Sequence, residues 1–81
     1  MIELTLYTRA DCGLCREMEQ LLSEEIPRFD ARLERVEIDG NPELEAQFGT
    51  EVPVLFVNKR KAFKYRCTTR ELRKRLMREV K

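Results

Sequence analysis

The sequence has no histidine, no long apolar run and only three cysteines, and each shortage argues against a class of protein. A structural zinc site takes four Cys or His ligands, more than this chain of 81 residues offers. No stretch approaches the roughly 20 apolar residues of a membrane-spanning helix, and no apolar run follows Met1 as in a signal peptide. An odd number of cysteines argues against a disulfide-stapled secreted scaffold. We therefore expect a cytoplasmic protein without a metal site or a membrane partner.

Length and charge bound the organisation of the chain. Its length predicts a single domain over residues 1–81, and we expect a monomer. The net charge of +1 hides an asymmetry, because residues 1–58 carry a net −8 and residues 59–81 a net +9. Either the charges form a solvated surface with attraction between the halves, or a basic face steers an acidic protein or anionic substrate. Nucleic acid is not expected, since no binding motif accompanies the basic residues.

Hydrophobic spacing and turn signals predict the element order β-α-β-α-β-β-α. Apolar and polar residues alternate over Ile2–Thr8, which predicts a strand. An amphipathic helix follows from Arg16 to about Ile26 and ends at Pro27. Asn41 is the predicted N-cap of the second helix. The remaining predicted elements are a strand over Leu33–Ile38, a helix over Glu43–Phe48, strands over Val52–Val57 and Ala62–Arg66, and a helix capped by Thr68 or Thr69.

This order predicts an α/β fold. The first β-α-β unit must cross over right-handed, which makes its strands parallel, and the late hairpin adds an antiparallel edge. The result is a mixed four-stranded sheet with helices on both faces, which is the thioredoxin-like architecture.

The segment Cys12-Gly13-Leu14-Cys15 lies where the first strand turns into the first helix. Such a pair can cycle between dithiol and disulfide, hold half of a metal site, or fill space. The lack of histidine weakens the metal alternative, and the strand-to-helix context is typical of a thioredoxin-like redox motif. Unpaired N–H groups at a helix start favour the thiolate of Cys12, and Cys15 lies one turn further on. We therefore predict Cys12 as the nucleophile and Cys15 as the resolving thiol.

Three other positions are candidates for the same site. Arg9 favours the thiolate by Coulomb attraction, whereas Asp11 opposes it. Val52-Pro53 places a proline in an otherwise buried strand, which is unusual. A cis bond there would offer the Val52 backbone to a substrate, and an ordinary trans proline opening a strand remains the alternative. Cys67 is either a small residue where the last helix begins or a thiol for an alternative disulfide or glutathionylation.

These residues resemble glutaredoxins and small glutaredoxin-like proteins. The segment Leu6–Cys15 is similar to the strand, loop and CxxC of that family, with Arg9 where glutaredoxins usually carry a basic residue. Val52-Pro53 matches the Val-Pro of the Thr-Val-Pro motif, with Glu51 in place of the threonine. The resemblance covers nearly the whole chain. It implies a glutaredoxin-like fold, thiol-disulfide oxidoreductase activity, and a cis Pro53 that packs opposite Cys12 and Cys15.

The chain also departs from the glutaredoxin pattern. Gly13-Leu14 replaces the Pro-Tyr usual between the two cysteines, and Tyr65-Arg66 replaces a Gly-Gly that lets glutathione lie close. Thr68-Thr69 replaces the acidic pair that binds the amino end of glutathione. Thr68 and Thr69 join Arg9, Val52 and Pro53 as predicted substrate-binding residues.

Two functions from different classes follow. The first is a thiol-disulfide oxidoreductase that acts by a dithiol mechanism on a disulfide-containing protein or small molecule. It would hold no cofactor tightly and would be recycled by a thioredoxin-type reductase, with glutathione as the other candidate co-substrate. The second is a thioredoxin-fold binding module with little turnover that docks an acidic partner through its basic C-terminal face.

Overall fold

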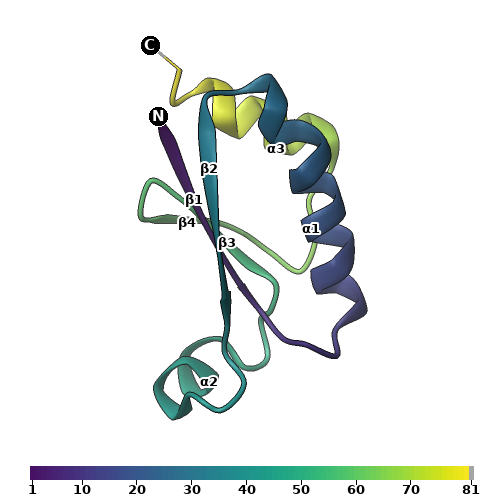
Figure 1. Ribbon diagram of the computed structural model, residues 1–81, viewed down its shortest axis with the longest axis vertical. Coiled ribbons are helices and arrows are strands. Elements are labelled where there is room, and N and C mark those ends of the chain that lie inside the picture. Colours follow the sequence, from purple (N-terminus) through teal and green to yellow (C-terminus); the bar gives the residue numbers. More distant parts are fainter. Residues whose placement is uncertain (81) are drawn as a thin grey trace.

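The computed structural model describes residues 1–80 and consists of one mixed sheet with helices packed against it (Figure 1). The strand order is β2-β1-β3-β4. Along the chain the elements are β1 (Ile2–Thr8), α1 (Gly13–Glu25), the short 3-10 helix η1 (Ile26–Arg28), β2 (Ala31–Glu37), α2 (Pro42–Phe48), β3 (Val54–Val57), β4 (Arg60–Lys64) and α3 (Thr69–Met77). The predicted thioredoxin-like order and the four-stranded mixed sheet are confirmed.

Strand pairing determines which ends of the strands lie together. β1 runs parallel to β2, with α1 as the crossover, whereas β3 is antiparallel to both β1 and β4. Tyr7 of β1 and Lys64 of β4 both lie opposite Val54, the first residue of β3. The end of β1, the start of β3 and the end of β4 therefore lie at the same end of the sheet. α1 begins at this end, because only a short loop separates it from β1.

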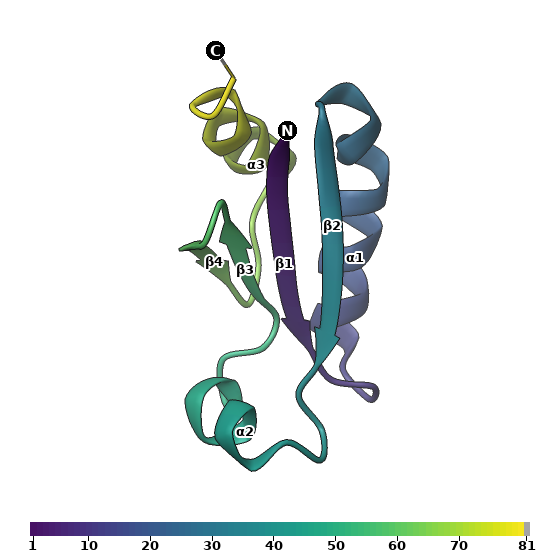
Figure 2. The same ribbon diagram turned by 60° about the vertical axis from the view of Figure 1, so that its left-hand side comes forward.

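The two faces of the sheet carry different helices, as predicted. One face holds the main core, formed by Ile2, Leu4, Leu6, Leu55 and Val57 of the strands, Met18 and Leu22 of α1, and Leu72 and Leu76 of α3. On the other face Tyr7 and Phe56 meet Phe48 of α2, and the ring centroids of Tyr7 and Phe48 are 4.4 Å apart. Figure 2 shows α2 beyond the strand ends, away from α1 and α3.

Several predicted element ends were wrong. The second strand begins at Ala31 and ends at Glu37, two residues earlier and one residue earlier than predicted, because its register follows the seven residues of β1. The hairpin turn is shorter than predicted, since Asn58 and Lys59 both have positive φ, at 47° and 69°. Such a two-residue turn matches the twist of the flanking strands. β4 therefore runs over Arg60–Lys64 rather than Ala62–Arg66. β3 begins at Val54 rather than Val52, since Pro53 has no N–H to donate to the sheet.

The first helix also starts earlier than predicted, at Gly13, because Cys12 is its N-cap. At its other end the chain tightens into η1, which contains Pro27. The predicted N-caps Asn41 and Thr68 are confirmed. Of the helices in residues 1–80, none has the length and apolar character that crossing a bilayer demands.

Candidate functional site

Cys12 and Cys15 are bonded to each other at the start of α1, with their Cα atoms 5.2 Å apart. Cys12 has an extended backbone, and its Sγ accepts a hydrogen bond from the Cys15 N–H at 3.2 Å. Cys12 is partly exposed, whereas Cys15 is 1% exposed. The outer sulfur is therefore the one that a second molecule can reach, and it lies at the positive end of the helix dipole.

Val52-Pro53 lies at the same end of the sheet. Its peptide bond is cis, as the resemblance to glutaredoxins implied. Because Val54 pairs with Tyr7, the buried Pro53 lies near the end of β1, the strand that leads to Cys12. Within residues 1–80 neither the amide nor the carbonyl of the half-buried Val52 takes part in a backbone hydrogen bond. Both groups are thus available to an extended segment of a second chain.

The ion pairs of Arg9 are with carboxylates, whereas the sequence suggested that it would stabilise the Cys12 thiolate. Its guanidinium reaches Asp39 at 3.7 Å and Glu45 at 3.6 Å, and the N–H of Ala10 donates to the same Asp39 carboxylate at 3.1 Å. The space it occupies is bounded by Gly49, where a Cβ would lie 3.3 Å from the guanidinium and 2.4 Å from the Glu45 carbonyl oxygen. Arg9 is therefore paired with two carboxylates, and its stabilisation of the Cys12 thiolate stays a prediction.

Thr68 and Thr69 lie at the start of α3, where Thr68 is the N-cap. The Thr68 hydroxyl accepts from the Glu71 N–H at 3.0 Å, and the Thr68 N–H donates to the Glu71 carboxylate at 2.8 Å. This reciprocal capping box uses the N–H and the hydroxyl oxygen of Thr68, and its carbonyl accepts from the Leu72 N–H at 3.0 Å. Thr69 is the exposed first residue of the helix. The structure thus gives Thr68 a capping function, and substrate binding by either threonine stays a prediction.

A groove of about 280 Å³, here called the α1 groove, separates α1 from the connection between β4 and α3. Figure 1 shows this connection passing beside α1. The buried Met18 on its floor lies one helical turn after Cys15, so the groove is next to the cysteine pair. Arg66 and Glu17 face each other across its rim at 3.8 Å. The lining residues are Glu17, Met18, Leu21, Tyr65, Arg66, Cys67, Thr68 and Thr69.

Cys67, the third thiol, packs in this groove. Its Sγ lies 3.7 Å from the Met18 sulfur, and the residue joins the edge of the main core. Burial, with a smaller contribution from Glu71, raises the pKa of the Cys67 thiol to about 11. The thiol is therefore protonated at neutral pH, which suits the first alternative for Cys67, a small residue where the last helix begins.

Sequence reasoning missed Arg16, beside the cysteine pair, and named Tyr65 only as a departure from the glutaredoxin pattern. Arg16 is exposed, and its guanidinium lies 4.0 Å from the point where Gly13 would carry a Cβ. It is a cation beside the cysteine pair, and its position directly after Cys15 was the available signal. Tyr65 has φ +67°, a conformation that favours glycine. The departure from the Gly-Gly of glutaredoxins was the signal for Tyr65.

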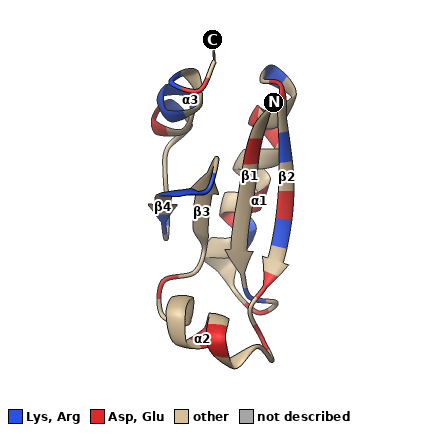
Figure 3. Cartoon of the chain, turned by 90° about the vertical axis from the view of Figure 1, so that its left-hand side faces the viewer, with Lys and Arg blue, Asp and Glu red and all other residues tan. Residues whose placement is uncertain are grey.

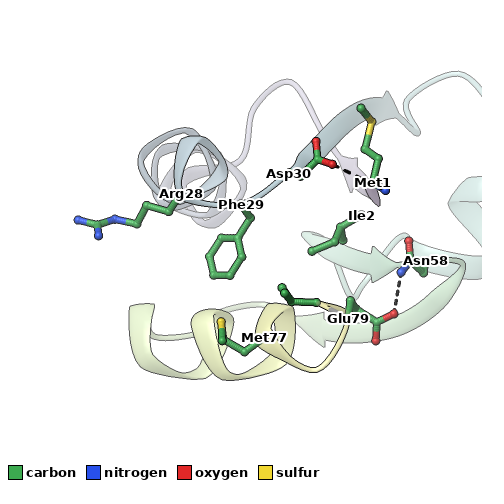
Figure 4. A pocket seen from close by; sticks show the side chains of 9 residues that line it. Met1, Ile2, Arg28, Phe29, Asp30, Asn58, Met77 and Glu79 are labelled. Carbon is green, nitrogen blue, oxygen red and sulfur yellow. Dashed lines mark hydrogen bonds and ion pairs between the residues drawn. The ribbon is translucent and has the colours of Figure 1, made fainter.

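A cavity of about 690 Å³, drawn in Figure 4, is lined by residues from the start of β1 and the end of α3. It lies at the opposite end of β1 from the cysteine pair. It includes Ile2 at the start of β1, whereas Cys12 follows the end of this strand, about 20 Å away for seven extended residues. Its carboxylates are occupied, since Asp30 lies 4.0 Å from the amino terminus and Glu79 accepts from Asn58 at 2.6 Å. Within residues 1–80 no group of three or more His, Cys, Asp or Glu is arranged to hold a metal ion.

Known structures share this fold. Protein XcR50 from X. campestris is 31% identical, with a TM-score of 0.80 over 93% of this chain and 96% of that chain. Protein Ne2328 from Nitrosomonas europaea is 30% identical, with a TM-score of 0.78 over 93% and 91%. Mitochondrial thioredoxin 3 from Saccharomyces cerevisiae, in its oxidized form, is 19% identical with a TM-score of 0.71 over 95% and 77%, which shows the fold alone. No curated protein matches the chain.

The family match is more specific than the fold. The model of the glutaredoxin-like domain (DUF836) matches residues 3–77, which include every helix and nearly every strand residue described above. This range contains the cysteine pair, the cis proline and the α1 groove. The chain therefore belongs to the glutaredoxin-like domain family (DUF836).

Proposed function

We propose that this protein is a thiol-disulfide oxidoreductase that acts by a dithiol mechanism. The observation that carries the proposal is the arrangement of its two neighbouring thiols. Cys12 is accessible at a helix N-terminus and accepts a backbone hydrogen bond, while Cys15 is buried directly behind it. A hydrogen bond and the helix dipole both stabilise a thiolate at Cys12. Burial keeps Cys15 from attacking substrates directly while leaving it within reach of Cys12.

The reaction balances with two electrons from the protein dithiol. The Cys12 thiolate attacks one sulfur of the substrate disulfide, so that a mixed disulfide forms and the other substrate sulfur leaves as a thiolate that takes a proton. The Cys15 thiolate then attacks the Cys12 sulfur, closes the intramolecular disulfide and releases the second substrate thiol. The substrate is reduced and the protein is oxidised. A thiol reductant, either glutathione or a thioredoxin-type reductase in the cytoplasm, restores the dithiol.

Val52 would hold the substrate during this exchange. Its free amide and carbonyl can pair with an extended polypeptide on either side of the substrate cysteine, as in strand addition to a sheet edge. This placement supports a disulfide-containing protein as substrate, and small disulfides can reach Cys12 without it.

The direct test uses reduced protein in a single turnover, so that no other reductant is present. Wild-type protein should convert one peptide disulfide into two thiols per molecule. Cys12→Ser should abolish the reaction, and Cys15→Ser should stop at a mixed disulfide that intact mass spectrometry detects. Oxidised wild-type protein is the control and should release nothing. The proposal fails if Cys12→Ser reacts as fast as wild type.

A second candidate function follows from a basic groove between β4 and α3, of about 450 Å³. Figure 3 shows Lys and Arg gathered on these two elements. Among residues 1–80, Arg60, Lys74 and Arg78 have no carboxylate within ion-pair distance. The lining residues are Arg60, Lys61, Ala62, Phe63, Glu71, Lys74, Arg75 and Arg78. This excess of cations favours a module that docks an acidic polypeptide segment, alone or together with the exchange reaction.

A further inference from the structure

Tyr65, directly after β4, has a backbone that only glycine adopts without cost. Its φ is +67°, and the Arg66 N–H donates to the Lys64 carbonyl at 2.8 Å, which closes a three-residue turn around it. A γ-turn with positive φ at its centre is the rare and strained form of that turn. Strain of this kind persists only where neighbouring structure imposes it, and it concentrates at functional sites.

The neighbours of Tyr65 place it at the proposed exchange site. Its N–H donates to the Pro53 carbonyl at 2.9 Å, which fixes it beside the cis proline. Pro53 lies near the end of β1, at the end of the sheet where α1 and Cys12 begin. Tyr65 also lines the α1 groove. Tyr65, the strained residue, therefore contacts the cis proline and also lines the α1 groove.

Packing does not account for a tyrosine at this position. The residue is 42% exposed, and Lys64 lies over its ring with Nζ 5.4 Å from the centroid. An exposed ring contributes little to the core, so glycine would serve the fold better. The aromatic side chain must therefore be explained by what it meets from outside.

We propose that Tyr65 determines specificity for polypeptide disulfides that carry an apolar residue next to the reacting cysteine. This inference rests on the proposed exchange function. Tyr65 lines the α1 groove together with the apolar residues Met18 and Leu21. With the substrate backbone held at Val52, the residue that flanks its cysteine enters this groove and packs against the ring. Aromatic rings are well suited to such contacts, because they offer a large, rigid apolar area.

The test measures second-order rate constants of reduced protein with three disulfides. Two are symmetric disulfides of the peptides Ala-Leu-Cys-Ala and Ala-Gly-Cys-Ala, and the third is glutathione disulfide. Wild type should react fastest with the Leu peptide. Tyr65→Gly should lower the Leu-peptide rate constant by about tenfold, in the range found when an interface anchor is truncated, and leave the Gly peptide nearly unchanged. Tyr65→Phe should retain the preference, because it keeps the ring.

Lys59 offers a matched control, since it is exposed, has φ +69° and lies in the β3–β4 turn at the far end of β3. Lys59→Gly and Tyr65→Gly should both raise the melting temperature, because each removes a side chain from a left-handed conformation. Only Tyr65→Gly should lose the Leu-peptide preference. A gain in stability with a loss of rate separates a role in recognition from a structural one.

Two results would overturn the inference while leaving the exchange function intact. One is a wild type that reacts equally with the two peptides or prefers glutathione disulfide. The other is a Tyr65→Gly variant that keeps the Leu-peptide rate while Cys12→Ser abolishes reaction. If Cys12→Ser itself reacts normally, the exchange function fails and the inference fails with it.

Discussion

The three cysteines have different surroundings at the scale of single residues. Cys12 accepts a backbone N–H at the positive end of a helix, and Cys15 is buried behind it. Cys67 has apolar contacts with Met18 and a carboxylate nearby at Glu71. Burial disfavours charge on the third thiol, whereas we expect the helix start to favour charge on the first. Their chemical reactivity should therefore differ widely in the fully reduced protein.

We predict that Cys67 alkylates much more slowly than Cys12 in reduced protein. With a pKa of about 11, only about one Cys67 in ten thousand is a thiolate at pH 7, and the thiolate is the reactive form. Iodoacetamide should label Cys12 at least about tenfold faster, as peptide mass spectrometry can measure. The labelling rate of Cys67 should rise about tenfold per unit of pH below its pKa. Equal labelling of both thiols at pH 7 would contradict this account of Cys67.

Residue roles could be predicted from the sequence only where the contacts are local. The thiols of Cys12 and Cys15 lie three residues apart, so a helix turn alone brings them together. Arg9 instead meets carboxylates from other segments, at Asp39 and Glu45. The strained Tyr65 depends on a hydrogen bond to Pro53. Such partners are set by the tertiary fold, so neither role could be found from local pattern.

The same distinction holds at the scale of elements. The N-cap Asn41 of α2 was predicted correctly, and Thr68 was one of the two predicted caps of α3, because each side chain bonds to an N–H three residues away. The ends of β2 and β4 were not predicted correctly, because strand length depends on the neighbouring strand. The start of a helix thus depends on local sequence, whereas the end of a strand depends on the neighbouring strand with which it pairs.

Helices α1 and α3 are joined by an ion pair between a buried carboxylate and a partly exposed arginine, which the sequence did not reveal. Glu25 has a side chain only 6% exposed, and Arg73 donates to both of its carboxylate oxygens, at 2.6 and 3.1 Å. Arg28 approaches the same carboxylate at 3.9 Å. The hydrogen bonds and charge of Arg73 hold the pKa of Glu25 below its usual range. The pair therefore links α3 to the last residue of α1.

We predict that Glu25→Gln lowers the melting temperature by a few degrees at pH 7 and much less at pH 3. A carboxylate with a lowered folded-state pKa stabilises the fold above its unfolded pKa. That contribution is lost as the pH falls through the folded value, so acid removes the advantage of the wild type. Thermal unfolding followed by circular dichroism at both pH values measures the difference.

Glu24→Gln is the matched control for this ion pair. Glu24 is exposed and accepts a hydrogen bond from Gln20 at 3.0 Å. Its replacement should change the melting temperature little at either pH, since exposed contacts contribute weakly. Equal melting temperatures of the two variants at pH 7 would show that the Glu25–Arg73 pair does not stabilise the fold.

At the scale of the whole molecule, the two oppositely charged parts of the chain are only partly matched. Ion pairs join them at Glu17–Arg66, Glu25–Arg73 and Glu51–Lys61, which agrees with attraction between the halves, one of the two alternatives that the charge asymmetry left open. The cations of the basic groove exceed what these pairs neutralise. A molecule with a net charge near zero thus keeps a basic face on β4 and α3 (Figure 3).

We predict that this face binds acidic polypeptides in a salt-dependent way. The probe is a fluorescein-labelled octapeptide of alternating Asp and Glu, followed by fluorescence anisotropy. Raising NaCl from about 50 to about 200 mM should weaken binding severalfold, because exposed charges are screened over about 8 Å at physiological salt. The double variant Lys74→Glu/Arg78→Glu should reduce affinity by about tenfold or more, since each reversal replaces attraction with repulsion.

The double variant Arg28→Glu/Arg32→Glu separates a local groove from net charge. It changes the net charge by the same amount but lies on η1 and β2, away from the groove. If the groove holds the peptide, this control should retain most of the affinity while the groove variant loses it. If both variants lose affinity equally, the peptide responds to overall charge alone, and the basic groove is solvated surface rather than a docking site. Reduced wild-type protein should bind like the oxidised form, because the groove lies on β4 and α3 rather than at the cysteine pair.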